Sequence, residues 1–359
     1  MTPTAIAAVD VRPVRWPLRR PFVTALGRKT HSENVLVAVR LTGGLVGRGE
    51  ASSSLAMPFQ TGHRMASALR RLAPWSRGRD VRDIRSLSLA LWRREGAWPT
   101  AAAAFEAALW DALAQSEGVP LYALWGKKQT EIETVLSVSA VDPAEVGRRA
   151  ARAGRAGYRT IKLKLNGAEG AAINIERVRR AFQGAPRARF LLDPNQSLTP
   201  VLLEEILAGA RRDGVPLAAV EEPFPKHRWD LLEEARPPCP LILDESIQSA
   251  RDARIAYRRD GVSGANIKLA KSGVLRSFDI VDETRAARGR RARLMIGCMA
   301  ESRLGLAAAV HFALGTGVFD EADLDSDLIL RPTPFRGGYV RRGPWIRLPR
   351  RPEPGLGVR

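Results

Sequence analysis

Short apolar runs recur along the last two thirds of the chain at a nearly constant spacing, and this repeat restricts the possible folds most. Each run is followed by a stretch of helical periodicity, and successive runs end between 23 and 29 residues apart. The eight runs are 134–139, 160–165, 189–193, 217–222, 240–245, 264–269, 292–297 and 317–323. Eight successive strand-helix units predict a (β/α)8 barrel of the modified TIM type. The alternative, an open doubly wound sheet, lacks the glycine-rich phosphate loop expected after its first strand.

Residues 1–128 have a different pattern and are expected to form an α+β capping domain. Strand character is found in 9–18, 34–42 and 46–51, and helical periodicity near 60–75, 79–94 and 99–117. The pair Gly43-Gly44 favours a hairpin between the second and third strands. The barrel is then expected over 129–325, and the Pro- and Gly-rich tail 326–359 is expected to pack back on the capping domain.

Acidic residues end three consecutive strands of the expected barrel. They are Asp193, Glu221 and Asp244. Active sites of barrel enzymes form at the C-terminal ends of the strands, so these side chains are expected to meet there. Three neighbouring carboxylates repel one another unless a hard cation binds them, whereas each alone could be a capping or ion-pairing acid. The set predicts one Mg²⁺ per subunit, for which Mn²⁺ is expected to substitute.

Lysine is rare in this chain, which makes its positions informative. Only eight of the 57 basic residues are lysines, so that 49 are arginines. Arginine stays protonated, whereas a buried lysine can lose its proton and act as a base. Lys164 and Lys268 end strands that lie four apart, which predicts bases on opposite sides of the barrel mouth. Lys162, on the same strand face as Lys164, is expected to disfavour the ammonium form of Lys164.

These parts together predict a proton transfer at carbon. A carboxylate substrate held by Mg²⁺ would lose its α-proton to one lysine, give a metal-stabilised enediolate, and regain a proton from the other lysine. Bases on both faces permit inversion at that carbon, so the residues indicate a racemase or epimerase.

The net charge of +19 raises a different function, binding of nucleic acid. The basic residues are spread thinly, without an aromatic-interleaved basic motif, so we expect a solvated arginine-rich surface and no nucleic-acid partner. Two cysteines and four histidines are too few for a disulfide framework or a zinc cluster. The sequence has no signal-peptide pattern and no long apolar segment, which favours a cytoplasmic protein without a membrane partner. The sequence is also compatible with a homo-oligomer.

The motifs resemble those of the muconate-lactonizing subgroup of the enolase superfamily, from about residue 10 to the end. TIKLKL carries the subgroup's Lys-x-Lys, LLDPNQ its Asp-x-Asn, VEEP its metal glutamate, LDES its metal aspartate and NIKLAKSG its second lysine. The resemblance implies a capping domain whose loops, here 21–34 and 51–62, close over the barrel.

Within the subgroup, DLDSDLIL resembles the dipeptide epimerases. The resemblance implies that Asp323 and Asp325 bind the free α-ammonium of a dipeptide, which is epimerised at its C-terminal residue. It also implies that the substrate-binding residues include Asn195, Met299, Thr24 and Gly27. GCMAESRLG resembles the same enzymes and makes Glu301 a supporting residue, although an acid near the start of a helix has an equally good structural role.

Gly27 departs from that resemblance. Epimerases acting on L-Ala-D/L-Glu carry an arginine at this place, in a sequence like PFKTALR, whereas this chain has PFVTALG. An acidic second residue is therefore not expected from this position, and a neutral, apolar or cationic one is compatible with it. The alternative activities are those of an N-acylamino acid racemase, an o-succinylbenzoate synthase or a cycloisomerase, and the remote alternative is a basic nucleic-acid-binding protein on this fold.

Overall fold

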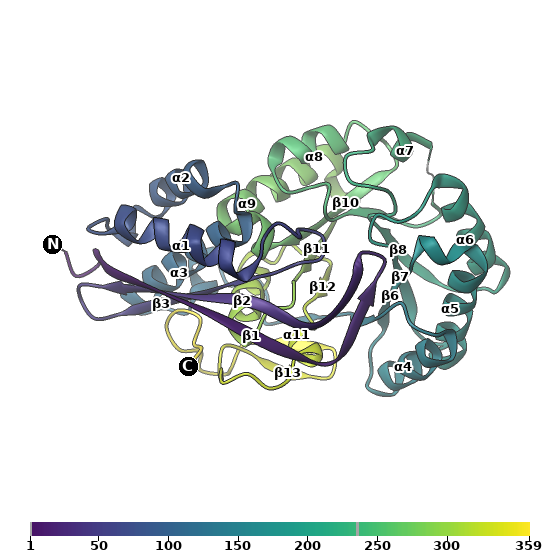
Figure 1. Ribbon diagram of the computed structural model, residues 1–359, viewed down its shortest axis with the longest axis horizontal. Helices are drawn as coiled ribbons and strands as arrows, with labels where there is room; N and C mark the ends of the chain where they lie inside the picture. The colour runs from purple at the N-terminus through teal and green to yellow at the C-terminus, as the bar shows by residue number, and fades with distance from the viewer. Residues whose placement is uncertain (1, 235–236) are drawn as a thin grey trace.

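The computed structural model describes residues 2–234 and 237–359, which form a cap and a barrel lying next to each other (Figure 1). The cap contains a three-stranded antiparallel sheet, in the order β1-β2-β3, and three helices. Its elements are β1 (Ile6–Thr24), β2 (Gly27–Leu41), β3 (Val46–Ser52), α1 (Gly62–Ser76), α2 (Ile84–Glu95) and α3 (Pro99–Ser116). The strands and helices expected from the sequence are confirmed for this part of the chain.

Eight parallel strands form the barrel, as the repeat of apolar runs predicts. They are β5 (Leu136–Val138), β6 (Thr160–Lys164), β7 (Arg189–Asp193), β8 (Leu217–Glu221), β9 (Leu241–Leu243), β10 (Val262–Lys268), β11 (Arg293–Gly297) and β12 (Glu321–Asp323). They pair in chain order from β5 to β12. A parallel bridge between Thr134 and Ala322 brings the chain before β5 against β12, so the ring is nearly closed.

Helices follow the strands and surround them. They are α4 (Pro143–Arg155), α5 (Gly170–Gly184), α6 (Pro200–Arg212), α7 (Trp229–Glu234), α8 (Ala250–Ala256), α9 (Leu269–Arg288) and α10 (Arg303–Thr316). Side-chain oxygens of Asp142, Thr199, Ser249 and Ser302 accept hydrogen bonds from backbone N–H groups in the first turns of α4, α6, α8 and α10. These caps satisfy donors that a helix cannot pair internally, and they fix where each helix begins. No helix within 2–234 and 237–359 is long and apolar enough to cross a membrane.

The inside of the barrel has an apolar layer and, above it, a charged layer. The apolar layer is a separate cluster of four buried side chains, Leu191, Ala219, Ile242 and Met295. Residues two positions further along a strand share its face and lie nearer its C-terminal end. Those positions on β7 and β8 are Asp193 and Glu221, and the one after Ile242 is Asp244, and all three are buried. The strand register therefore places the acids together at the barrel mouth.

The segment 21–34, which was expected to be a loop, is the tip of a long hairpin instead. β1 continues to Thr24 and β2 begins at Gly27, and Thr24 pairs with Gly27 across the turn. Gly27 has a φ of 133°, which only glycine adopts easily. The glycine that replaces the expected arginine therefore lets the two strands turn. The segment 51–62 begins in β3 and then bends, with a bridge between Ser54 and Met57.

The C-terminal tail contacts both parts of the molecule. It contains α11 (Ser326–Ile329), β13 (Val340–Arg342) and β14 (Trp345–Arg347), and β14 pairs with β4 (Glu131–Glu133) just before the barrel. Further along, bridges join Leu330 to Leu18 and Gly355 to Pro120, both in the cap segment.

A buried glutamate of the cap, Glu50 on β3, attaches the cap to the barrel. Within the cap its carboxylate accepts hydrogen bonds from Trp16 Nε1 (2.8 Å) and Asn34 Nδ2 (2.7 Å). From the barrel it accepts hydrogen bonds from Ser302 N (3.0 Å) and Gly305 N (3.1 Å), at the start of α10. An anion at this place also interacts favourably with the positive end of the helix dipole.

A second buried glutamate, Glu106 on α3, has a similar role. It accepts hydrogen bonds from Val274 N (3.0 Å) and Leu275 N (3.2 Å), immediately after a break in α9 at Gly273, whose φ is 65°. The cap therefore contributes buried acids to the backbone of two barrel helices.

We predict that Glu50→Ala lowers the free energy of unfolding by about 3 kcal/mol, because it leaves several buried donors without an acceptor. The measurement is denaturant-induced unfolding followed by circular dichroism. The matched control is Glu204→Ala, which removes an exposed partner of Arg211 and should cost less than about 1 kcal/mol. Equal unfolding midpoints for Glu50→Ala and the unchanged protein would show that this junction does not stabilise the fold.

Candidate active site

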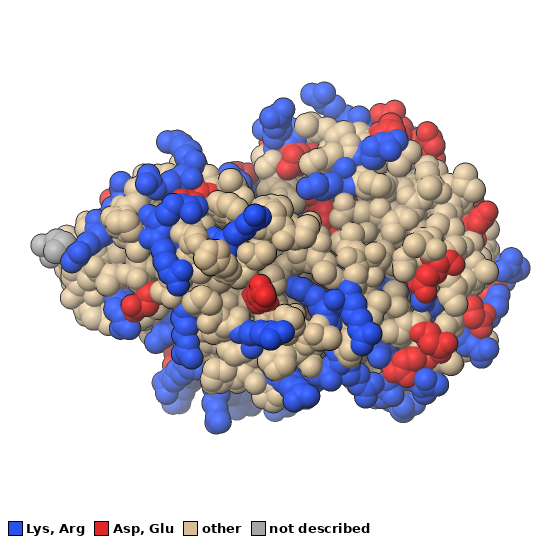
Figure 2. Space-filling model, in the orientation of Figure 1, with Lys and Arg blue, Asp and Glu red and all other residues tan. Residues whose placement is uncertain are grey.

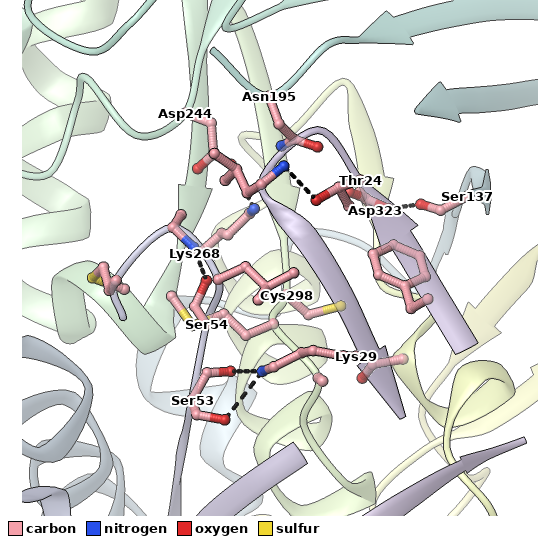
Figure 3. A pocket seen from close by; sticks show the side chains of 18 of the residues that line it. Thr24, Lys29, Ser53, Ser54, Ser137, Asn195, Asp244, Lys268, Cys298 and Asp323 are labelled. Carbon is pink, nitrogen blue, oxygen red and sulfur yellow. Dashed lines mark hydrogen bonds and ion pairs between the residues drawn. The ribbon is translucent and has the colours of Figure 1, made fainter. Parts of the chain in front are cut away.

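A cavity lies between the mouth of the barrel and the cap. The barrel contributes polar side chains at the ends of its strands, among them Lys164, Asn195, Asp244, Lys268, Asp323 and Asp325. The cap contributes mostly apolar side chains from the tip of the β1-β2 hairpin and from residues 53–57, among them Phe22, Leu26, Leu55 and Met57. Figure 3 shows residues of both parts around the cavity, with Asp244, Asn195 and Lys268 of the barrel at one end and Lys29 and Ser53 of the cap at the other. The cavity therefore has a charged floor and an apolar roof.

Lys162 is the centre of the charged layer under this floor. Its Nζ lies 2.9 Å from Asp193, 2.8 Å from Glu221 and 2.7 Å from Asp323, and its side chain has no exposed surface. Burial disfavours the ammonium form, but the charges of Asp193 and Asp323 outweigh burial and raise the pKa of Lys162 above its usual value. Lys162 therefore carries a positive charge that compensates acids on three other strands.

Lys164 and Lys268 lie on β6 and β10, which are four strands apart in the eight-stranded ring and so on opposite sides of the mouth. Lys164 Nζ lies 2.5 Å from Asp193, and Lys268 Nζ lies 2.6 Å from Asp244. A Cβ atom at Gly297, on the neighbouring strand, would approach Lys268 Cε to 2.9 Å, so the glycine leaves room for this lysine. Both side chains reach the cavity.

Asp244 is compensated twice. Its carboxylate binds Lys268 and, at 2.6 Å, Lys271, whose Nζ also donates to the Asp244 carbonyl oxygen. Burial again disfavours the ammonium of Lys268, yet the charge of Asp244 raises its pKa above the usual value. In this arrangement Lys164 and Lys268 are each ion-paired with an acid that the sequence assigns to metal binding.

The donor set fits Mg²⁺ in its chemistry. Within the described residues no three acidic, histidine or cysteine side chains converge as a ready metal site, because lysine ammonium groups lie between the carboxylates. Two further oxygens at the cavity, Asn195 Oδ1 and Glu245 Oε2, are buried and accept no hydrogen bond. Mg²⁺ binds hard oxygen ligands of this kind. A cation there would take over the compensation that Lys164 and Lys268 provide in this structure.

Glu222 supports the end of strand β9, which the sequence analysis did not foresee. Its carboxylate accepts hydrogen bonds from Asp244 N (2.7 Å) and Ser246 N (3.2 Å), and its φ of 35° turns the chain out of β8. Burial raises the pKa of Glu222 to about 7. The two glutamates of VEEP therefore have different structural roles. Glu221 faces the barrel interior, whereas Glu222 accepts a hydrogen bond from the backbone N–H of Asp244.

Asp323 and Asp325 meet the first barrel strand at the opposite edge of the cavity. Ser137 donates from its hydroxyl to Asp323 (3.2 Å) and from its backbone N–H to Asp325 (2.7 Å), and Figure 3 shows Ser137 beside Asp323. Burial, and then the charge of Asp323, raise the pKa of Asp325 to about 6. Within the described residues, Asp323 forms an ion pair with a lysine and Asp325 does not. These two neighbouring carboxylates can therefore bind a further cationic group.

The other residues named from the sequence are divided between the cavity and its surroundings. Thr24, Asn195 and Met299 line the cavity, whereas Gly27 does not. Glu301 does not line it either: its carboxylate accepts a hydrogen bond from Met299 N (3.0 Å), and burial raises its pKa to about 7. Glu301 therefore positions the backbone beside the cavity and does not face into it.

Two cavity lysines were missed by the sequence reasoning. Lys271 lies in the first turn of helix α9 and forms an ion pair with Asp244. Lys29 projects from β2 of the cap and donates a hydrogen bond to Ser53. The rarity of lysine in this chain was a signal that could have identified both. Neither lysine stands at the end of an expected barrel strand, so position on a strand does not indicate a role for them.

Comparison with known proteins agrees with this geometry. Residues 6–126 match the family model for the N-terminal domain of mandelate racemase / muconate lactonizing enzyme, and residues 145–359 match the enolase C-terminal domain-like model. The aromatic dipeptide epimerase of Herpetosiphon aurantiacus is 31% identical, over 96% of this chain and 97% of that protein. The L-Ala-D/L-Glu epimerase of Thermotoga maritima is 32% identical, over 93% of this chain and 96% of that protein.

A solved structure of a dipeptide epimerase is similar to this chain over its whole length. The dipeptide epimerase of Methylococcus capsulatus, complexed with Mg and the dipeptide L-Arg-D-Lys, superimposes with a TM-score of 0.88 and 31% identity, over 99% of each chain. The chain belongs to the mandelate racemase / muconate lactonizing enzyme family of the enolase superfamily.

Proposed function

We propose that this chain is a Mg²⁺-dependent dipeptide epimerase, an isomerase that inverts the α-carbon of the C-terminal residue of its substrate. The observation that carries the proposal is the placement of Lys164 and Lys268 on opposite sides of one cavity, with Asp323 and Asp325 at its edge. The activities of the similar proteins support it, since they are epimerases of dipeptides, and one was crystallised with Mg.

The chemistry requires one amine to be neutral and the other to be charged. The neutral lysine removes the α-proton on one face, and the ammonium of the other lysine returns a proton on the opposite face. Mg²⁺, when bound to Asp193, Glu221 and Asp244, stabilises the negative charge on the substrate carboxylate. Asp323 and Asp325 orient the substrate through its α-ammonium. Lys162 does not line the cavity, so its buried charge acts on the reacting groups from beneath.

We predict that this protein, incubated with dipeptides and Mg²⁺ in D2O, exchanges the α-hydrogen of the C-terminal residue and epimerises it. Lys268→Ala and Lys164→Ala should each lower epimerisation by about 10³-fold, because general acid-base groups contribute rate factors of this order. Each variant should still exchange the α-hydrogen of one stereoisomer, the one whose proton faces the remaining lysine. Mass spectrometry and NMR measure both quantities.

Lys128→Met is the control for these two variants, since Lys128 is exposed and does not line the cavity. It should leave the rate unchanged. The proposed function is wrong if no dipeptide in a broad library exchanges, or if N-succinyl amino acids turn over while dipeptides do not. Full epimerisation by Lys268→Ala would contradict the two-base scheme alone.

We predict that Mg²⁺ raises the unfolding temperature of the unchanged protein, because a ligand that binds only the folded state stabilises it. Asp244→Asn should abolish the shift, while Asp260→Asn, which changes an exposed acid, should preserve it. Thermal unfolding with and without MgCl2 measures this. A Mg²⁺-induced shift of the same size in Asp244→Asn would exclude Asp244 as a ligand.

We predict that dipeptides bind more weakly as the pH falls below 6. Asp325 has a raised pKa of about 6, so it takes up a proton between pH 7 and pH 5 and no longer attracts the substrate ammonium. KM should rise about tenfold over this interval for the unchanged protein. For Asp325→Asn, KM should already be high at pH 7 and change little. An unchanged KM across the interval would argue against Asp325 as an ammonium ligand.

A further inference from the structure

Lys29 is a cation in the roof of the cavity that forms no ion pair among the described residues. It projects from β2, is half-buried and lines the cavity. Its Nζ donates to Ser53 O (2.7 Å) and Ser53 Oγ (3.1 Å), as Figure 3 shows. Over 2–234 and 237–359 no ion pair involves Lys29, whereas Lys164, Lys268 and Lys271 in the same cavity each lie within 2.6 Å of a carboxylate oxygen.

The ammonium of Lys29 has three N–H donors, and Ser53 accepts hydrogen bonds from two of them. Burial lowers the pKa of Lys29 to about 8, and the charge of Glu33 offsets this effect only in part, so the group is still mostly charged at neutral pH. A half-buried cation that forms no ion pair within the described residues favours an anionic ligand group beside it.

The placement of the substrate directs one side chain toward this cation. Under the proposed function, the two lysines face the reacting carbon from either side, the carboxylate group of the substrate would lie toward strands β7 to β9, and its peptide nitrogen would lie toward β12. Under the floor, the barrel is filled by Lys162 and the apolar layer. The remaining substituent of the carbon is the side chain of the C-terminal residue, and only the direction of the cap is open to it.

The cap offers that side chain apolar walls with Lys29 among them. Phe22, Leu26, Leu55 and Met57 line the roof, and in the view of Figure 3 Lys29 lies at the other end of the cavity from Asp244 and Asn195. A side chain with an apolar stem and an anionic head matches both features. A cationic head would meet an uncompensated like charge.

Lys29 also occupies a suitable place in the hairpin. Residues two apart on a strand share a face, so Lys29 lies on the same face of β2 as Gly27. Arg28 lies on the opposite face, is exposed and does not line the cavity. The hairpin therefore presents Lys29 to the cavity.

We propose, on the basis of the proposed function, that Lys29 determines specificity and that this enzyme prefers dipeptides with an acidic C-terminal residue of glutamate length. The ammonium of Lys29 binds the side-chain carboxylate, while the methylene groups of the substrate lie against Leu26, Leu55 and Met57. This reverses the expectation that follows from Gly27 alone.

The test compares L-Ala-L-Glu with its neutral isostere L-Ala-L-Gln and with L-Ala-L-Leu, using α-hydrogen exchange in D2O to obtain kcat/KM. The unchanged enzyme should prefer the glutamate substrate by at least about tenfold over either neutral one. Lys29→Met should lower kcat/KM for L-Ala-L-Glu by about 10- to 100-fold, the effect of losing a charge-assisted hydrogen bond. It should leave the value for L-Ala-L-Gln within about threefold.

Two further variants separate recognition from folding. Lys29→Arg retains the charge and should restore most of the preference for glutamate, whereas Lys29→Gln retains a donor to Ser53 without the charge and should behave like Lys29→Met. Lys128→Met should have no effect. A purely structural role of Lys29 would lower kcat/KM for all three dipeptides alike, and the preference would persist.

The outcomes distinguish this inference from the proposed function. If no dipeptide exchanges with any variant, the proposed function fails. If dipeptides exchange but the unchanged enzyme shows no preference for glutamate, or if Lys29→Met keeps that preference, the inference is overturned and the epimerase function stands.

Discussion

The compensation of buried acids by buried lysines is the interaction on which the rest of the site depends. Four lysines and four acids meet in one layer of the barrel, with each ammonium within 2.9 Å of a carboxylate: Lys162, Lys164, Lys268, Lys271, Asp193, Glu221, Asp244 and Asp323. None of these groups could be buried alone without a cost of several kcal/mol. Because the charges in this layer balance, the ion pairs that compensate the buried acids also hold Lys164 and Lys268 in place at the barrel mouth.

The cap covers this charged layer, and buried hydrogen bonds fix its position on the barrel. The carbonyl oxygen of Ala300, at the cavity, accepts hydrogen bonds from Asn34 Nδ2 (2.9 Å) and Ser52 Oγ (3.1 Å) of the cap. Two residues further along, Ser302 donates to Glu50. The loop between β11 and α10 is therefore joined to the cap sheet, and the shape of the cavity depends on strands of the cap.

Much of this arrangement could be predicted from the sequence. Strands buried on both faces give apolar runs at a regular spacing, and side-chain alternation then places Lys164 and Asp193 at the strand ends. Contacts that depend on three-dimensional proximity could not be predicted. The hairpin tip has the composition of a loop, so the local pattern around Lys29 does not indicate that this lysine faces the barrel. Glu301 follows a strand end, as the acids predicted to bind metal do, yet its carboxylate accepts a hydrogen bond from Met299 N. In these cases the local pattern is the same and the tertiary contact differs.

Charge is unevenly distributed around the cavity, and this fixes how a dipeptide can lie in it. The floor is neutral overall because its lysines and acids are paired. The edge formed by β12 is acidic, since Asp325 has no lysine partner within the described residues, and the roof is basic because Lys29 forms no ion pair there. A dipeptide that binds as proposed, with its ammonium at β12 and an anionic side chain at the roof, would satisfy both edges. The reversed orientation would place like charges together at each end, so electrostatics favours one of the two α-carbons between the lysines.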